Sequence, residues 1–264
     1  MIDELKPHEE VIESSVRSLA KEISLQGEVR DPLMVDQRDH VVLDGMHRFS
    51  ALVSLKCRFA PCCLIDYDSE RIKIGSWFRL FMVDNEDRLA EDVLKANNLP
   101  YSKRQTTHEI NCDPQTIMMT GTGTVFSLPN DWDAIRRAKT GIRLEKDLVK
   151  RGLTVEYLSE VVAVQKLKSG QVNLVISLPI FTKEQIRECG VQGRLLPHKV
   201  TRHVIPSRPL GINVPLSLLR DQNISLPEAD LKLKELLKRK RITSKPPGSV
   251  VEGRRYEEEL LLFS

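Results

Sequence analysis

The N-terminal third of the chain alternates between helical and strand-like spacing of its apolar residues. From Glu9 to Leu25 apolar residues recur every three or four positions, the spacing of an amphipathic helix, and Gly27 follows as a stop signal. Short apolar runs bounded by polar residues are typical of strands. The pattern predicts a helix over residues 9–25, paired strands over 32–36 and 40–44, a helix over 49–56 and a strand over 60–68.

The pattern changes after Trp77. A polar stretch rich in Thr and Asn covers residues 97–116, and Gly121 and Gly123 predict the turn of a hairpin. Helices and strands that alternate in this way indicate a mixed α/β fold. The remaining apolar pattern predicts helices over 86–96, 132–141, 155–170 and 182–193, strands over 173–180 and 201–206, and a basic helix near the C-terminal end.

The composition is that of a globular protein, because 264 residues with 41% hydrophobic content can build a sizeable core. No window approaches 18 uncharged apolar residues, and the N-terminal ten residues are charged and lack an apolar segment. We therefore predict neither a membrane span nor a secretory signal, and a cytoplasmic location. The cysteines are odd in number and lack paired CxxC spacing, which predicts reduced thiols at Cys57, Cys62, Cys63, Cys112 and Cys189.

The net charge of +3 is too small to indicate a nucleic-acid partner by itself. The charge is unevenly distributed, because a basic cluster runs from Lys232 to Lys245 and an acidic, helix-like segment follows at residues 253–263. A basic helix can contact a phosphate backbone, but a solvated helix face is the commoner case. We therefore regard a nucleic-acid partner as the weaker interpretation.

Asp44, Gly45, His47 and Arg48 lie together where a predicted strand turns into a predicted helix. The start of a helix presents unpaired N–H groups and the positive end of the helix dipole, and a glycine lets an anion approach closely. Arg48 can add a forked, charge-assisted contact and His47 a further donor, which together suit a polyphosphate.

Asp44 does not fit a simple anion site, because a carboxylate repels an anion unless a cation bridges the two. Its presence predicts Mg²⁺ held between Asp44 and phosphate oxygens. The alternative is purely structural, with Asp44 as the N-cap of the helix and with His47 and Arg48 in ordinary surface hydrogen bonds.

The segments PLMV, VVLDGMHRFSAL and APCCLI resemble the N-terminal domain of the ParB/sulfiredoxin superfamily, in which a strand, an Asp-Gly-x-His-Arg turn and a helix bind nucleotide phosphates. Within that group the chain looks most like the free L-serine kinases, because LKPHEE, IGSWF and HKVTRHVIP also recur in the right order between residues 6 and 206. The resemblance implies a ParB/sulfiredoxin-like nucleotide-binding domain over residues 1–76. A second α/β lobe over residues 77–264 would complete the serine site.

The resemblance also implies an activity, the transfer of a phosphoryl group from ATP or ADP to the hydroxyl of L-serine. Glu9 would be the catalytic base, and Asp44 would act through Mg²⁺ or orient the hydroxyl. Met46 replaces the first histidine of the family's DGHHR form, which removes any expectation for that side chain. The remaining implied residues are the phosphate-binding turn Gly45, Met46, His47 and Arg48, and the serine-binding residues Trp77, Thr201, Arg202 and His203.

Other classes fit the sequence less well. The main alternative is a ParB-like nucleotide- or DNA-binding regulator without catalysis, but a DNA-partition protein needs a helix-turn-helix where this chain predicts strands. A sulfiredoxin-type reductase needs a reactive cysteine beside the turn, and residues 42–50 contain none. The P-loop and protein-kinase motifs are also absent from the sequence.

Overall fold

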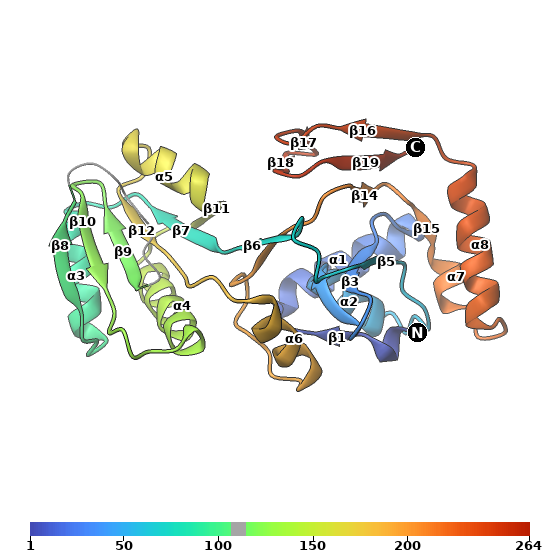
Figure 1. The fold of residues 1–264 in the computed structure, drawn as a ribbon, viewed down its shortest axis with the longest axis horizontal. Helices are drawn as coiled ribbons and strands as arrows, with labels where there is room; N and C mark the ends of the chain where they lie inside the picture. Colours follow the sequence, from blue (N-terminus) through green and yellow to red (C-terminus); the bar gives the residue numbers. More distant parts are fainter. Residues whose placement is uncertain (107–114) are drawn as a thin grey trace. The chain divides into compact units, whose positions relative to one another are not determined.

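The computed structural model describes residues 1–106 and 115–264, and these residues form two compact units (Figure 1). Unit 1 comprises Met1–Lys73, Lys183–His198 and His203–Ser264, and unit 2 comprises Ile74–Thr182 and Lys199–Arg202. The short strands β6 (Lys73–Gly75) and β13 (Arg202–Val204) each contain a point where the chain passes from one unit to the other. The C-terminal part therefore divides differently from the boundary expected at residues 76 and 77.

The central sheet of unit 1 has four strands in the order β1-β4-β3-β5. β1 is parallel to β4, β4 is antiparallel to β3, and β3 is parallel to β5. The predicted strand pair and the strand that follows it are thus confirmed. The four strands are β1 (Lys6–Pro7), β3 (Leu33–Asp36), β4 (Val41–Asp44) and β5 (Cys62–Ile65).

Three helices pack around this sheet. α1 (Glu13–Gln26) packs on α2 (Met46–Ser54), and α2 contacts β3, where Leu33, Val35, Val42 and Met46 form a buried apolar cluster. α6 (Lys183–Val191) contacts β1 and β4. This approach is close, because a Cβ at Gly190 would lie 2.8 Å from Val41 Cγ1. The packing of α6 explains why residues 183–198 belong to unit 1.

Smaller elements complete unit 1, and most come from the C-terminal third. Residues 253–263, expected to be helix-like, contain strands instead, because the run LLLF lies between β14 and β16 and pairs with both. The strands are β2 (Glu28–Val29) paired with β15 (Val214–Pro215), the sheet β14 (Arg208–Leu210), β19 (Leu260–Phe263) and β16 (Ile242–Lys245), and the hairpin β17 (Val250–Val251) and β18 (Arg254–Arg255). The helices are η1 (Ile2–Glu4), α7 (Leu216–Arg220) and α8 (Leu226–Lys238).

Unit 2 is built on a six-stranded sheet in the order β11-β7-β12-β9-β10-β8. Its helices contact the sheet at different strands, α3 at β9 and α5 at β7, β11 and β12, while α4 contacts α3 (Figure 1). The strands are β7 (Trp77–Phe81), β8 (Ser102–Gln105), β9 (Thr116–Thr120), β10 (Thr124–Ser127), β11 (Glu156–Ser159) and β12 (Leu174–Ile176). The helices are α3 (Glu86–Ala96), α4 (Ala134–Lys150) and α5 (Glu160–Lys168).

Two expectations for unit 2 are corrected. The helix predicted over residues 155–170 begins only at Glu160, because the preceding four residues pair with β7 as β11. The polar stretch over residues 97–116 contains β8, which pairs with β10. Residues 107–114, with Cys112, lie outside the described residues, and the other four cysteines are free thiols. Among the helices of the described residues, none is long and apolar enough to cross a lipid bilayer.

Candidate active site

Glu9 and Asp44 lie at the carboxyl ends of two adjacent parallel strands in unit 1. β1 and β4 are in register with Lys6 opposite Val41 and Pro7 opposite Val42; Glu9 follows the end of β1 by two residues, and Asp44 is the last residue of β4. The carboxyl ends of parallel strands are where ligands commonly bind in α/β sheets.

The segment that carries Glu9 is extended, which corrects the helix predicted over residues 9–25. Glu9 forms a β-bridge with Leu196, and the Glu10 N–H donates to the Leu196 carbonyl oxygen at 2.8 Å. α1 begins only at Glu13, because Val11 packs with the core under the sheet instead of joining a helical face. The helix dipole therefore does not act on Glu9, whose side chain is buried to 9% exposure while Glu10 is exposed.

Gly45 makes the turn between β4 and α2. Its φ of +97° lies in the left-handed region, which favours glycine, and a Cβ there would lie 2.8 Å from Leu33 Cδ2 and 3.1 Å from Arg48 Nη1. α2 begins at Met46, three residues earlier than predicted, and its N-cap glycine has no side chain to cap the first N–H groups. The first N–H groups of a helix have no partner within it, and this is the feature on which the anion site expected from the sequence depends.

The three residues after Gly45 differ in what their side chains do. Met46 packs in the core at 8% exposure, so its side chain does not line an anion site. His47 accepts a hydrogen bond at Nε2 from the Ile12 N–H at 3.2 Å, and its ring meets the His198 ring edge-on. Arg48 Nη1 donates to the Pro32 carbonyl oxygen at 2.6 Å, which holds the guanidinium beside the Gly45 turn.

Asp44 forms an ion pair with a buried arginine, which sequence reasoning missed. Its Oδ2 accepts from Arg208 Nη1 at 2.6 Å, and Arg208 Nε donates to Glu258 Oε1 at 2.7 Å. Burial by itself would raise the pKa of Asp44, but the nearby guanidinium groups, Arg208 above all, outweigh burial and hold this pKa far below its usual range. Arg208 comes from β14 and Glu258 from the residue pair before β19, and they are 164 and 214 positions from Asp44 in the chain. No local sequence pattern signals a contact over such a separation.

His203 lies in the interior of unit 1, with 7% exposure. Its Nε2 is 2.8 Å from the Tyr67 hydroxyl, and its ring packs edge-on against the ring of His8. His8 in turn donates from Nδ1 to the Val42 carbonyl oxygen at 2.6 Å. Burial lowers the pKa of His8 to about 4 and that of His203 to about 3, so both imidazoles are neutral at neutral pH.

Trp77, Thr201 and Arg202, the other residues expected to bind serine, belong to unit 2. The Arg202 guanidinium lies 5.6 Å from the centre of the Trp77 ring, and Thr201 is buried at 7% exposure. Sequence reasoning missed Lys199, whose ammonium lies 3.9 Å from the centre of the Tyr157 ring and 6.0 Å from that of Trp77. Two cations beside two aromatic rings could hold a carboxylate, as a serine site requires.

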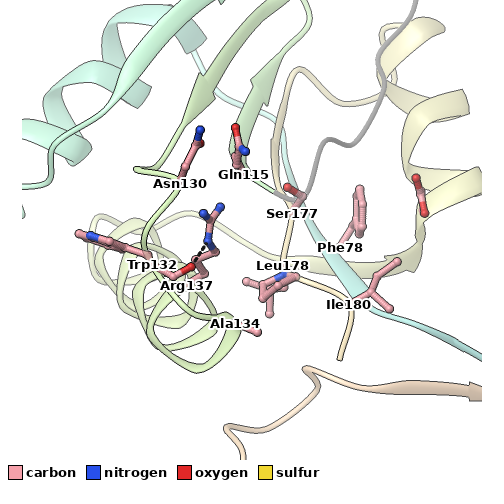
Figure 2. A pocket seen from close by; sticks show the side chains of 11 residues that line it. Phe78, Gln115, Asn130, Trp132, Ala134, Arg137, Ser177, Leu178 and Ile180 are labelled. Carbon is pink, nitrogen blue, oxygen red and sulfur yellow. Dashed lines mark hydrogen bonds between the residues drawn. The ribbon is translucent and has the colours of Figure 1, made fainter. Parts of the chain in front are cut away.

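Unit 2 also contains a cavity of about 330 Å³ (Figure 2). Apolar side chains line much of it, and Arg137 lies in its wall, where Nη2 donates to the Pro129 carbonyl oxygen and Nε to that of Trp132. The residues that line it, as far as the chain is described, include none of the predicted site residues. The lining residues are Phe78, Gln115, Asn130, Trp132, Ala134, Arg137, Glu160, Ser177, Leu178, Pro179 and Ile180.

Asp44 is the residue that the sequence assigns to a metal ion. Within residues 1–106 and 115–264, no group of three or more His, Cys, Asp or Glu side chains is arranged to hold a metal. Mg²⁺ nevertheless often binds through one or two carboxylates together with water and substrate phosphates. The Asp44 carboxylate is 35% exposed and bonds Arg208 through Oδ2, so it fits a site in which a nucleotide supplies most of the ligands.

Comparisons with known proteins give relatives for most of the chain. No protein-family model matches it. It is 25% identical to an ATP-dependent L-serine kinase of Desulfurococcus mucosus, over 83% of this chain and 89% of the relative. It is 24% identical to the ADP-dependent L-serine kinase SerK of Thermococcus kodakarensis, over 83% of this chain and 90% of the relative. A ParB-like protein of Sulfolobus acidocaldarius is 27% identical to this chain, over 76% of this chain and 86% of the relative.

Two solved structures share the fold. SbnI with a C-terminal truncation from Staphylococcus aureus has a TM-score of 0.70 at 20% identity, covering 90% of this chain and 93% of that one. A free serine kinase in complex with AMP has a TM-score of 0.67 at 24% identity, covering 83% and 91%. The comparisons confirm the predicted mixed α/β fold and the resemblance to L-serine kinases and ParB-like proteins.

Proposed function

We propose that the protein is a free L-serine kinase, which transfers a phosphoryl group from ATP or ADP to the serine hydroxyl and yields O-phospho-L-serine. The observation that carries the proposal is the placement of Glu9 and Asp44 at adjacent strand ends beside the Gly45 turn. The similarity to L-serine kinases, which extends over 83% of the chain at 24–25% identity, supports the same activity.

The Gly45 turn is the proposed binding site for the donor phosphates. The first N–H groups of α2 and the Arg48 guanidinium supply donors and positive charge. His47 accepts a hydrogen bond at Nε2 from the Ile12 N–H, which orients its ring at the start of α2, and it remains a proposed phosphate-binding residue. Mg²⁺, when bound with the nucleotide, would neutralise phosphate charge, and Asp44 is the residue that would hold it.

Glu9 is the proposed general base. In phosphoryl transfer the serine oxygen forms a bond to phosphorus while the bond from phosphorus to the bridging oxygen of the nucleotide breaks, and the hydroxyl proton passes to the Glu9 carboxylate. The products are O-phospho-L-serine and ADP or AMP. Trp77, Thr201, Arg202 and His203 remain the proposed serine-binding residues, and Lys199 is added to them because its ammonium lies in the same cluster as Trp77.

The activity is tested by incubating the purified protein with L-serine, Mg²⁺ and either ATP or ADP. We expect ³¹P NMR to show O-phospho-L-serine with at least one donor. The relatives include an ATP-dependent and an ADP-dependent enzyme, so both donors belong in the screen. A lack of product with either nucleotide, together with tight DNA binding at physiological salt, would favour the alternative of a ParB-like regulator, which the name of the Sulfolobus relative and the basic cluster from Lys232 to Lys245 support.

Arg48→Ala is expected to weaken nucleotide binding. The substitution removes a charged donor beside the turn, and hydrogen bonds to charged groups contribute roughly 1.5–3 kcal/mol. Isothermal titration calorimetry measures the affinity, and Arg17→Ala is the control because Arg17 pairs with Glu13 on the exposed face of α1. An unchanged nucleotide affinity in Arg48→Ala would remove Arg48 from the site.

A further inference from the structure

Arg208 is a buried arginine held between two carboxylates and a carbonyl group. It is 3% exposed, and each of its three nitrogens donates to a different oxygen of unit 1. Nη1 donates to Asp44 Oδ2 at 2.6 Å, Nε to Glu258 Oε1 at 2.7 Å, and Nη2 to the His203 carbonyl oxygen at 3.2 Å. Three contacts from a planar group fix the orientation of the guanidinium.

The C-terminal sheet supplies this arrangement. Arg208 begins β14, which pairs in parallel with β19 in the register Arg208 opposite Leu260, and the Arg208 N–H donates to the Glu259 carbonyl oxygen at 3.1 Å. Glu258 therefore lies beside Arg208 at 5% exposure, and the two residues form an ion pair within the C-terminal sheet region. Asp44 differs from Glu258, because 35% of its side chain is exposed.

This difference in exposure suits Glu258 to a structural role and Asp44 to contact with a ligand. A fully buried ion pair is weak evidence for stability, because desolvation offsets much of the attraction. Its better use is to fix a neighbouring group in one geometry, and a catalytic group displaced by about 1 Å can lose about 10²-fold in rate. Of the two carboxylates that Arg208 binds, Asp44 and Glu258, Asp44 is the one whose side chain is partly exposed.

We propose that Arg208 is a positioning residue that fixes the Asp44 carboxylate beside the Gly45 turn, and that Glu258 fixes Arg208. The inference rests on the proposed kinase function and gives the C-terminal sheet a role in it. Arg208 acts through Asp44, so its loss lowers turnover and leaves the binding of nucleotide, which depends on the turn and Arg48, nearly unchanged.

The test compares Arg208→Met and Arg208→Lys with the wild type, with kcat and nucleotide affinity measured separately. We expect Arg208→Met to lower kcat by about 10²-fold with the nucleotide Kd within about threefold of wild type. We expect Arg208→Lys to recover part of the rate, because an ammonium keeps the charge although it lacks the fork. Circular dichroism and thermal melting report whether each variant is folded.

Two further variants keep the test independent of folding. Arg208→Met removes the cation that pairs with the buried Glu258 and the partly exposed Asp44, so the double variant Arg208→Met with Glu258→Gln, which removes one charge of each sign, should fold better. Arg187→Met is the matched control, because Arg187 is 5% exposed and binds Asp36 at 2.7 Å elsewhere in unit 1. We expect the double variant to have a kcat well below that of the wild type. We expect folded Arg187→Met to have the kcat of the wild type.

The outcomes separate this inference from the proposed function. A wild type that forms no phosphoserine contradicts the kinase function itself. If the wild type is active, a folded double variant with kcat within threefold of wild type overturns the role of Arg208. A tenfold rise in nucleotide Kd at unchanged kcat also overturns it, because Arg208 would then be a phosphate ligand. If folded Arg187→Met lost as much kcat as the Arg208 variants, their loss would reflect general destabilisation, and the proposed role of Arg208 would be contradicted.

Discussion

Glu9→Gln is expected to lower kcat by about 10²–10⁴-fold, the usual effect of removing a general base, while nucleotide affinity stays nearly unchanged. The amide keeps the shape of the side chain and cannot accept the serine proton. Glu9 is fixed on both sides, by the pairing of β1 with β4 and by the bridge to Leu196, so the substitution should not move the backbone. Steady-state kinetics with serine and nucleotide varied in turn give kcat, and calorimetry gives the nucleotide affinity.

Glu10→Gln is the matched control for this prediction. Because the segment is extended, successive side chains face opposite sides, and Glu10 is exposed where Glu9 is buried. The same chemical change one position further along should therefore leave kcat within about twofold of wild type, an estimate that follows from the opposite direction of the side chain. Near-normal turnover in Glu9→Gln, or a larger loss in Glu10→Gln, would show that the base is assigned to the wrong residue.

Gly45→Val is expected to destabilise the protein and to abolish tight nucleotide binding. A β-branched residue at a φ of +97° is strained by about 1–3 kcal/mol, and crowding against Leu33 Cδ2, 2.8 Å from the added Cβ, costs about 1–3 kcal/mol more. The same Cβ would lie 3.1 Å from Arg48 Nη1, so the guanidinium beside the turn would have to shift by a few tenths of an ångström. Nucleotide affinity should fall by at least about tenfold, the equivalent of one charged hydrogen bond. Urea unfolding and calorimetry measure the two effects.

Gly27→Val separates backbone strain from the contacts of the turn. Gly27 also has a left-handed φ, +72°, but no atom lies within 4 Å of its added Cβ. The control should lose only the strain energy and bind nucleotide as the wild type does. Equal losses of nucleotide affinity in the two variants would mean that the Gly45 turn is not the phosphate site.

Local sequence signals were sufficient where one short segment contains all the groups that decide its structure. The strand, turn and helix over residues 40–54 follow from an apolar run, a glycine with a left-handed φ and helical spacing, and the structure has them in that order. The anion site at the start of α2 could be inferred for the same reason, because a helix start and its glycine are neighbours in sequence.

The local signals failed where another segment competes for the same residues. The spacing of Val11 fits a helical face, but Val11 packs against the core cluster of Leu33, Val35, Val42 and Met46, and pairing with β4 and Leu196 keeps residues 6–10 extended. Residues 156–159 and 260–263 have spacing that fits a helix, yet each run forms a strand because partner strands are available. Pairing energy from distant strands overrides a local preference that is worth less than about 1 kcal/mol per residue.

By itself the sequence determined the strand-turn-helix over residues 40–54, the mixed α/β class and the resemblance to serine kinases. Only the tertiary structure decided that residues 183–198 and the C-terminal sheet join unit 1, and that Arg208 and Glu258 lie next to Asp44. The physical reason is the range of the interactions. A turn or a helix start is specified by neighbours in sequence, whereas an ion pair between residues 164 positions apart exists only after the sheets have brought its two side chains together.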